Sequence, residues 1–197
     1  RLPVEVAEAY ATGLEERVRQ GQPIDHIASV ASFFVSRIDT VIDKEIDRRV
    51  AEGDPEAETL KGLRGKVAIA NAKMAYAKYQ ELCASSRWKA LAKAGAQPQR
   101  LLWASTGTKN PAYPDTLYVD ELIGPHTVNT LPDATIDAFA DHGTPARTID
   151  VATAVTESTR TWARLANVGV DMDDVAAQLE REGVTSFQTS FADLLGA

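Results

Sequence analysis

The sequence predicts an α/β fold, and more specifically the second part of a larger α/β barrel. Short apolar segments at residues 27–35, 100–105 and 127–131 alternate with longer segments in which apolar residues recur at helical spacing. Strands that alternate with helices pair in parallel. A closed barrel, however, takes eight strands and typically about 250 residues. Because three strands would leave a sheet with bare edges, the shortage indicates an incomplete barrel.

The first helices are bounded by residues that favour helix ends. Residues 3–20 have helical periodicity, with Pro3 suited to the first turn and Gly21 to the exit. After the first strand, residues 38–50 repeat the helical spacing until Gly-Asp-Pro at 53–55 breaks it. The first helix is therefore expected before the first strand in the chain, and the second helix after it.

The later elements follow the same alternation. A long helix is predicted at 66–86 and a short helical turn at 117–122. Pro132-Asp133 opens a helix that runs toward His142, since proline and an acid both suit a helix N-terminus. From about residue 150 the chain is expected to be helical. There, Asp171 would cap a helix that Gly183 ends.

The first strand predicts where a functional site would lie. Residues 27–36 carry no charge, and neither face alternates to polar residues, which is typical of a strand covered on both faces. Arg37 follows where this strand must end. In barrels of parallel strands, substrates sit at the carboxyl ends. A cation at this point can hold an anion.

Composition excludes several classes of function. The chain has 197 residues, enough for one domain, and its net charge of −7 argues against a broad nucleic-acid surface. The single Cys83 cannot form an internal disulfide, so a reducing, cytoplasmic setting is expected. His26, His126 and His142 lack metal-ligand spacing, so no metal is expected. No apolar run long enough for a membrane span and no signal peptide is visible. The start at Arg1 is compatible with an excised or incomplete polypeptide.

Four residues form a candidate anion site. Ser32 and Phe34 point to the same side of the first strand, Arg37 lies just past its end, and Lys109 lies in the loop after the next strand. Arginine offers a bidentate fork and lysine a point charge, so the two cations could clamp a phosphate. In the structural alternative, Arg37 pairs with Asp39 or with a helix C-terminus, Lys109 is solvated, Ser32 fills a crowded interior and Phe34 belongs to the core.

Other polar groups carry weaker signals. Ser105 opens a Ser-Thr-Gly-Thr turn that could supply hydroxyls and amides to an anion, although such turns are common in plain loops. Asp39, Asp43 and Glu45 on the second helix resemble a solvated face. No acid/base pair is predicted from them.

At several places the chain resembles transaldolases, in particular those of actinobacteria and similar bacteria. Residues 30–39 contain Ser-x-Phe-x-x-Arg, which resembles the sixth-strand segment of that family. The similarity continues through Gly-Lys-Val-Ala-Ile-Ala-Asn-Ala-Lys-Met-Ala-Tyr at 65–76 and Arg-Leu-Leu-Trp-Ala-Ser-Thr-Gly-Thr-Lys-Asn at 100–110. It extends to Tyr-Val-Asp-Glu-Leu-Ile-Gly-Pro at 118–125 and Thr-Val-Asn-Thr-Leu-Pro at 127–132. The resemblance therefore covers essentially the whole chain.

The resemblance implies a (β/α)8 TIM barrel, of which this chain would hold about the last three strands. Residues 1–145 would form these last barrel strands and helices, and residues 146–197 a helical C-terminal tail, within a single partial domain. The family transfers a dihydroxyacetone unit between sugar phosphates, sedoheptulose 7-phosphate and glyceraldehyde 3-phosphate, in the pentose phosphate pathway. It works through a lysine Schiff base without a metal or organic cofactor.

By position, the resemblance assigns roles to five residues. Ser32 would bind a hydroxyl of the dihydroxyacetone unit, and Phe34 would line the pocket. Arg37 would bind the substrate phosphate, with Lys109 where many members have a second phosphate-binding arginine. Ser105 would be a neighbouring substrate-binding residue.

The family's first-strand motif, early acid/base residues and Schiff-base lysine have no counterpart in the sequence. A Schiff-base lysine needs a depressed pKa, usually from desolvation in a pocket, whereas the lysines here lie on predicted helices, connectors or loops. The expected partners are sugar-phosphate substrates and the N-terminal half of the barrel, with a monomer or homodimer when complete. The alternatives are a non-catalytic interaction module built on a truncated barrel and part of a transaldolase–sugar-phosphate isomerase fusion.

Overall fold

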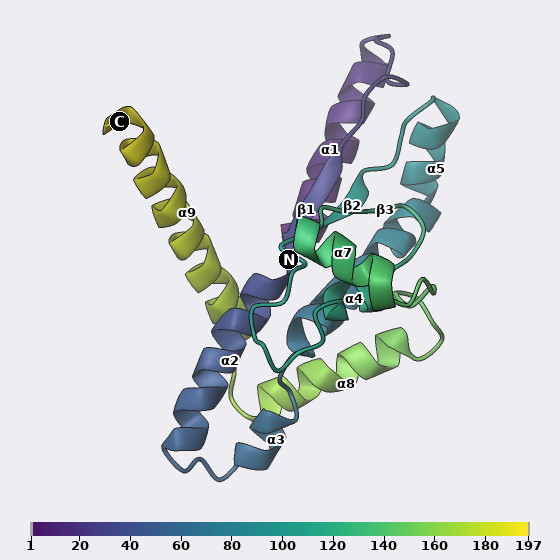
Figure 1. The fold of residues 1–197 in the computed structure, drawn as a ribbon. Coiled ribbons are helices and arrows are strands. Elements are labelled where there is room, and N and C mark those ends of the chain that lie inside the picture. The colour runs from purple at the N-terminus through teal and green to yellow at the C-terminus, as the bar shows by residue number, and fades with distance from the viewer. Residues whose placement is uncertain (1, 197) are drawn as a thin grey trace.

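The computed structural model describes residues 2–196, which form helices around a small sheet (Figure 1). In chain order the elements are α1 (Leu2–Arg19), β1 (Val30–Phe34), α2 (Val35–Ala51), α3 (Ala57–Lys61), α4 (Val67–Ala84), α5 (Ser86–Lys93), β2 (Arg100–Ala104), α6 (Leu117–Glu121), β3 (Thr127–Asn129), α7 (Asp133–His142), α8 (Ala154–Asn167) and α9 (Met172–Gly196). The predicted alternation of helices and strands is confirmed. The short helix α3 lies between the break at residues 53–55 and the helix predicted at 66–86, where no helix was predicted.

The sheet is parallel, with strand order β1-β2-β3. Its register pairs Ser32 with Leu102 and Phe34 with Ala104 across the first two strands. Trp103 pairs with Asn129 across the second two. Both parallel pairings confirm the sequence-based expectation. Consequently, the segments that follow β1 and β2 both leave the sheet at the carboxyl ends of its strands.

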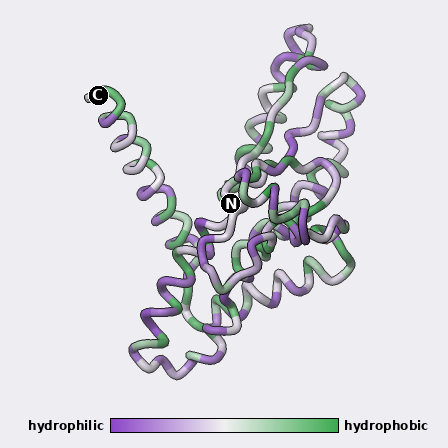
Figure 2. Tube along the Cα trace, in the orientation of Figure 1, coloured by the Kyte–Doolittle hydropathy of each residue, from purple (hydrophilic) through white to green (hydrophobic). Residues whose placement is uncertain are grey.

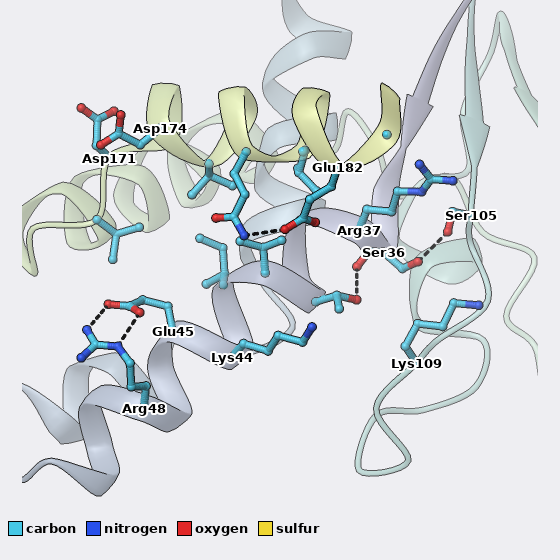
Figure 3. A pocket seen from close by; sticks show the side chains of 18 of the residues that line it. Ser36, Arg37, Lys44, Glu45, Arg48, Ser105, Lys109, Asp171, Asp174 and Glu182 are labelled. Atoms are coloured by element: carbon cyan, nitrogen blue, oxygen red, sulfur yellow. Dashed lines mark hydrogen bonds and ion pairs between the residues drawn. The ribbon is translucent and has the colours of Figure 1, made fainter. Parts of the chain in front are cut away.

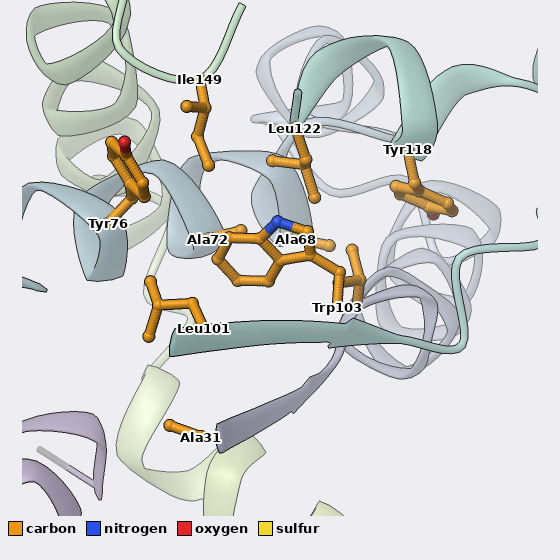
Figure 4. Packing of buried hydrophobic residues seen from close by; sticks show 10 residues of the cluster. Ala31, Ala68, Ala72, Tyr76, Leu101, Trp103, Tyr118, Leu122 and Ile149 are labelled. Carbon is orange, nitrogen blue, oxygen red and sulfur yellow. The ribbon is translucent and has the colours of Figure 1, made fainter. Parts of the chain in front are cut away.

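One face of the sheet is covered by α4. Trp103 is only 1% exposed and packs in a cluster with Ala68 and Ala72 of α4 (Figure 4). Alanine at both helix positions lets the helix approach the strand closely, leaving room for the indole ring. Phe33 adds an edge-to-face contact, its ring centroid 5.4 Å from that of Trp103. This face supplies the main core of the fold.

The opposite face of β1 is open, so the prediction of a strand buried on both faces is wrong. Val30 is 40% exposed and Phe34 45% exposed, whereas Ala31 on the other face is buried. The strand is also shorter than residues 27–35, because Val35 already belongs to α2. Residues alternate between the two faces of a strand, so Ala31 and the partly buried Phe33 share the packed face, and Val30, Ser32 and Phe34 share the exposed one.

The two C-terminal helices differ in how they pack. Leu165 of α8 and Val175 of α9 join a second core with α2, α3 and α4. Asp171 caps α9 as predicted, accepting a hydrogen bond from the Asp173 amide at 2.8 Å. The prediction that Gly183 ends this helix is wrong, because α9 continues to Gly196. A single glycine in a helix costs only about 1 kcal/mol, which neighbouring turns can offset.

The C-terminal half of α9 presents apolar side chains to solvent. Figure 1 shows α9 projecting away from the other elements, and Figure 2 shows hydrophobic residues continuing to its end. The exposed apolar residues of this half recur at helical spacing and comprise Val184, Phe187, Phe191, Leu194 and Leu195. None of the described helices is long and apolar enough to cross a membrane. The division of the chain at residue 145 stays a prediction.

Candidate anion-binding site

Two serines join the carboxyl ends of β1 and β2. The hydroxyl groups of Ser36 and Ser105 share a hydrogen bond of 2.8 Å, and the Ser36 amide donates to the Ser105 carbonyl at 3.1 Å. Ser105 has a φ of 56°, in the left-handed region that non-glycine residues rarely adopt. Such backbone strain persists where the surrounding structure fixes it, and it is common at functional sites. The two strand ends are thus held at a defined spacing.

A cavity of about 900 Å³ lies beside these serines, between α2, α9 and the loop after β2. Arg37, Lys44 and Lys109 all line it (Figure 3). None of the three forms an ion pair with another residue in the described part of the chain. The α2 helix also begins here without a capping side chain or an acidic residue in its first turn. Its positive dipole end adds to the local positive charge.

Acidic residues also line the cavity, but several are engaged elsewhere. Glu45 accepts two hydrogen bonds from Arg48, at 2.9 and 2.7 Å. Glu182 accepts one from Gln178 at 2.8 Å, and the Asp171 side chain caps α9. In Figure 3, Glu45, Arg48 and Asp171 lie away from the serines, whereas Arg37 and Lys109 lie near Ser36 and Ser105. Figure 3 also draws the Glu182 carboxylate on the Arg37 side, so this end of the cavity has three cations against one carboxylate and an excess of positive charge. We call it the cation end, defined by Arg37, Lys44 and Lys109.

The predicted site residues are only partly brought together. Arg37, Lys109 and Ser105 line this cavity, as the predicted anion site requires. Ser32 and Phe34 instead line an adjacent hollow of about 360 Å³, to which Arg37 also contributes. The Arg37 guanidinium lies 4.3 Å from the centroid of the Phe34 ring, a cation–π contact. Arg37 thus connects the two hollows.

Two residues of the site were missed from the sequence. Lys44 lies two helical turns beyond Arg37 on α2, and both side chains reach the cavity. Their spacing of seven residues places them on the same face of a helix. Lys44 was overlooked because the charged residues of this helix were expected to be solvated. Ser36 was missed because its role depends on the partner Ser105, which is distant in sequence.

The alternative in which Arg37 pairs with Asp39 is wrong, because Asp39 is 1% exposed and points into the protein. It accepts hydrogen bonds from the Tyr118 hydroxyl at 2.8 Å and from the Ala68 amide at 2.9 Å, in the first turn of α4. Burial raises the pKa of Asp39 to about 6 despite these bonds. Asp43 is buried too and accepts from the Tyr113 hydroxyl at 2.6 Å. The expected solvated face is therefore wrong for both aspartates.

No strand in residues 2–196 carries a lysine. Lys73 on α4 is buried, but it forms an ion pair with Glu121. Lys73 lines neither the cavity beside Ser36 and Ser105 nor the hollow at Ser32 and Phe34. This buried lysine is therefore a poor candidate for imine formation.

Comparison with known proteins identifies the family. The family model for transaldolase/fructose-6-phosphate aldolase matches residues 4–197. A transaldolase of Saccharopolyspora erythraea is 52% identical over 191 residues, covering 97% of this chain and 50% of the relative. A transaldolase of Frankia alni is 49% identical with the same two coverages, and one of Trichodesmium erythraeum is 48% identical, covering 98% of this chain and 52% of the relative. The chain thus spans about half the length of these relatives. It belongs to the transaldolase/fructose-6-phosphate aldolase family.

Proposed function

We propose that this chain is the phosphate- and substrate-binding part of a transaldolase. The reaction would transfer a dihydroxyacetone unit between sugar phosphates of the pentose phosphate pathway. The observation that carries the proposal is the cation end, which lies where the strands β1 and β2 end. In barrel enzymes, substrates bind at these carboxyl ends of the strands. Family membership supports the same reaction class.

The cations would hold the substrate's phosphate group. The planar guanidinium of Arg37 can donate two parallel hydrogen bonds to phosphate oxygens. Lys109 and Lys44 would add point charges from the loop and from the next turns of α2. The hydroxyl groups of Ser36 and Ser105 lie at the same end and can rotate to donate to an oxygen.

The sugar would extend from the phosphate across the open face of β1. Ser32 and Phe34 lie on this face, and Arg37 lines the same adjacent hollow. The Ser32 hydroxyl would bind a hydroxyl of the dihydroxyacetone unit, and the Phe34 ring would exclude water beside it. The Schiff base requires a lysine amine that attacks the ketose carbonyl and expels water. In this proposal that lysine belongs to the N-terminal half of the barrel.

The fold would accordingly be the last three strands of a (β/α)8 barrel, and its partner the N-terminal half. Two exposed features support this partner. Val30 and Phe34 leave apolar surface on the open face of the sheet, and within residues 2–196 β1 and β3 each have one edge without a pairing strand. Burying such surface against a complementary half would stabilise both pieces by mass action.

Phosphate binding can be tested on the chain itself. Fructose 6-phosphate should bind more tightly than fructose, and Arg37→Gln should weaken the phosphorylated ligand about 10- to 100-fold, the effect of losing hydrogen bonds to a charged group. Arg160→Gln is the matched control, because Arg160 is exposed on α8 away from the cavity. Equal affinities for the two sugars would contradict the phosphate role.

The division of labour can be tested by borohydride trapping with fructose 6-phosphate. The chain alone should form no reduced adduct. A mixture with the N-terminal half of the Saccharopolyspora erythraea transaldolase should form one on that half. Trapping on the isolated chain would show that it contains the nucleophile, and absence of trapping in the mixture would argue against the enzyme-half proposal.

A further inference from the structure

The loop that carries Lys109 is anchored at both of its ends. At its start, Ser105 is bonded to Ser36 of α2, and the Thr106 hydroxyl donates to the side-chain oxygen of Asn129 in β3 at 2.7 Å. Toward its end, the Tyr113 hydroxyl donates to the Asp43 carboxylate of α2 at 2.6 Å. Both anchors on α2 lie on the helix that also carries Arg37.

The Tyr113–Asp43 contact is strong and specific. Asp43 is buried, and its other carboxylate oxygen makes no hydrogen bond among the described residues. The hydrogen bond from the Tyr113 hydroxyl is therefore the main contact that offsets the desolvation of this carboxylate. Burial and the neighbouring carboxylate raise the pKa of Tyr113, which keeps its hydroxyl protonated as a donor. The ring also packs on Gly65, where an added Cβ would lie 3.1 Å from the ring carbon Cζ. A neutral donor to a buried carboxylate makes a charge-assisted hydrogen bond.

A tight turn transmits this anchor to Lys109. The side-chain oxygen of Asn110 accepts from the Ala112 amide at 3.0 Å, and its carbonyl accepts from the Tyr113 amide at 3.1 Å. The segment from Asn110 to Tyr113 is therefore a closed unit, and Lys109 is the residue just before it. The position of Tyr113 against α2 therefore constrains the backbone next to Lys109.

We propose that Tyr113 and Asp43 are positioning residues, which set the spacing of Lys109 and Arg37 to fit one phosphate group. They touch no substrate themselves and act through the loop. This inference rests on the proposed phosphate site, but it adds that the affinity of the site depends on a partly buried contact between two residues that do not line the cavity.

The test is the affinity of the chain for inorganic phosphate, measured by isothermal titration. Tyr113→Phe should weaken it about tenfold, the effect expected when Lys109 no longer contributes its charged contact. Tyr118→Phe is the matched control. It removes another buried hydrogen bond to an aspartate of α2, the 2.8 Å bond to Asp39, but Tyr118 lies beyond the loop, in α6. Its affinity should stay within about twofold of the unmodified chain. An equal loss in both variants would overturn the inference.

Coupling to Lys109 separates positioning from general destabilisation. In a Tyr113→Phe background, Lys109→Gln should have almost no further effect on phosphate affinity, whereas Arg37→Gln should keep its full effect. Non-additive losses of this kind indicate that two residues act as one unit. Full additivity of the Tyr113 and Lys109 substitutions would overturn the inference.

Tryptic cleavage after Lys109 distinguishes failure of this inference from failure of the phosphate site. Tyr113→Phe should accelerate cleavage at this exposed residue, and Tyr118→Phe should not. An unmodified chain that does not bind phosphate would refute the proposed function and with it the effect on affinity. An unchanged cleavage rate in Tyr113→Phe would refute the anchor itself, whatever the titration shows.

Discussion

The contribution of the buried Asp39 to the stability of this chain should decrease as the pH rises. Its carboxyl group has a pKa of about 6 in the folded state, against an ordinary value of 3.8. Between these values the folded chain retains a proton that the unfolded chain has released. The free energy of unfolding from this group is therefore highest below about pH 4, declines as the pH rises to about 6 and is constant above it. The full interval corresponds to about 3 kcal/mol.

Asp39→Asn isolates this contribution. The asparagine side-chain oxygen can still accept from the Ala68 amide, and its amide can donate to the Tyr118 oxygen, so the fold should be kept. Urea unfolding of both proteins at a series of pH values from 3.5 to 7.5 gives the difference in unfolding free energy. Carboxyl groups common to both proteins, including the neighbouring Asp43, largely cancel in that difference.

The variant should gain about 2 to 3 kcal/mol relative to the unmodified chain as the pH rises across this range. The opposite trend would mean that hydrogen bonds from Tyr118 and Ala68 outweigh the desolvation of the carboxylate. A difference that does not change with pH would mean that Asp39 has the same pKa in both states. Either result would refute the reasoning.

Two further substitutions test packing and charge. Gly124→Ala should lower the free energy of unfolding by about 1 to 3 kcal/mol, because the added Cβ would collide with the buried Ile149. Gly13→Ala in α1, which has open space for a Cβ, should instead raise it by about 0.5 to 1 kcal/mol, and similar effects of both on urea unfolding would contradict the packing described. Lys44→Gln should weaken inorganic phosphate binding about two- to fivefold at low salt, with less effect at high salt. Lys89→Gln on α5, outside the cavity, should leave the same titration unchanged.

Local patterns were sufficient to predict the strands and the residues at their ends. The apolar runs located all three strands, and parallel pairing then placed Arg37 and Ser105 at one edge of the sheet. This inference works because the carboxyl ends of parallel strands meet whatever the details of packing. Lys109 could be placed in the cavity for the same reason, since its loop leaves β2 at that edge.

The features that could not be predicted are mainly the burial and exposure of side chains, which depend on residues far along the chain. Asp39 and Asp43 are buried because tyrosines from beyond β2 reach them, and a charged helix face with no visible partner reads as solvated. The exposure of Phe34 was also hidden, because an apolar strand looks the same whether or not its second face is covered. Gly183 gave a false helix end, since periodicity alone does not separate a tolerated glycine from a terminating one.

The left-handed backbone of Ser105 has an evolutionary consequence. Glycine at this position would relieve about 1 kcal/mol of backbone strain, and the hydrogen bond to Ser36 contributes a similar amount to stability. The two effects nearly cancel, so selection for folding alone would tolerate either residue. Ser105 is thus a position where the demands of stability and of function can be told apart.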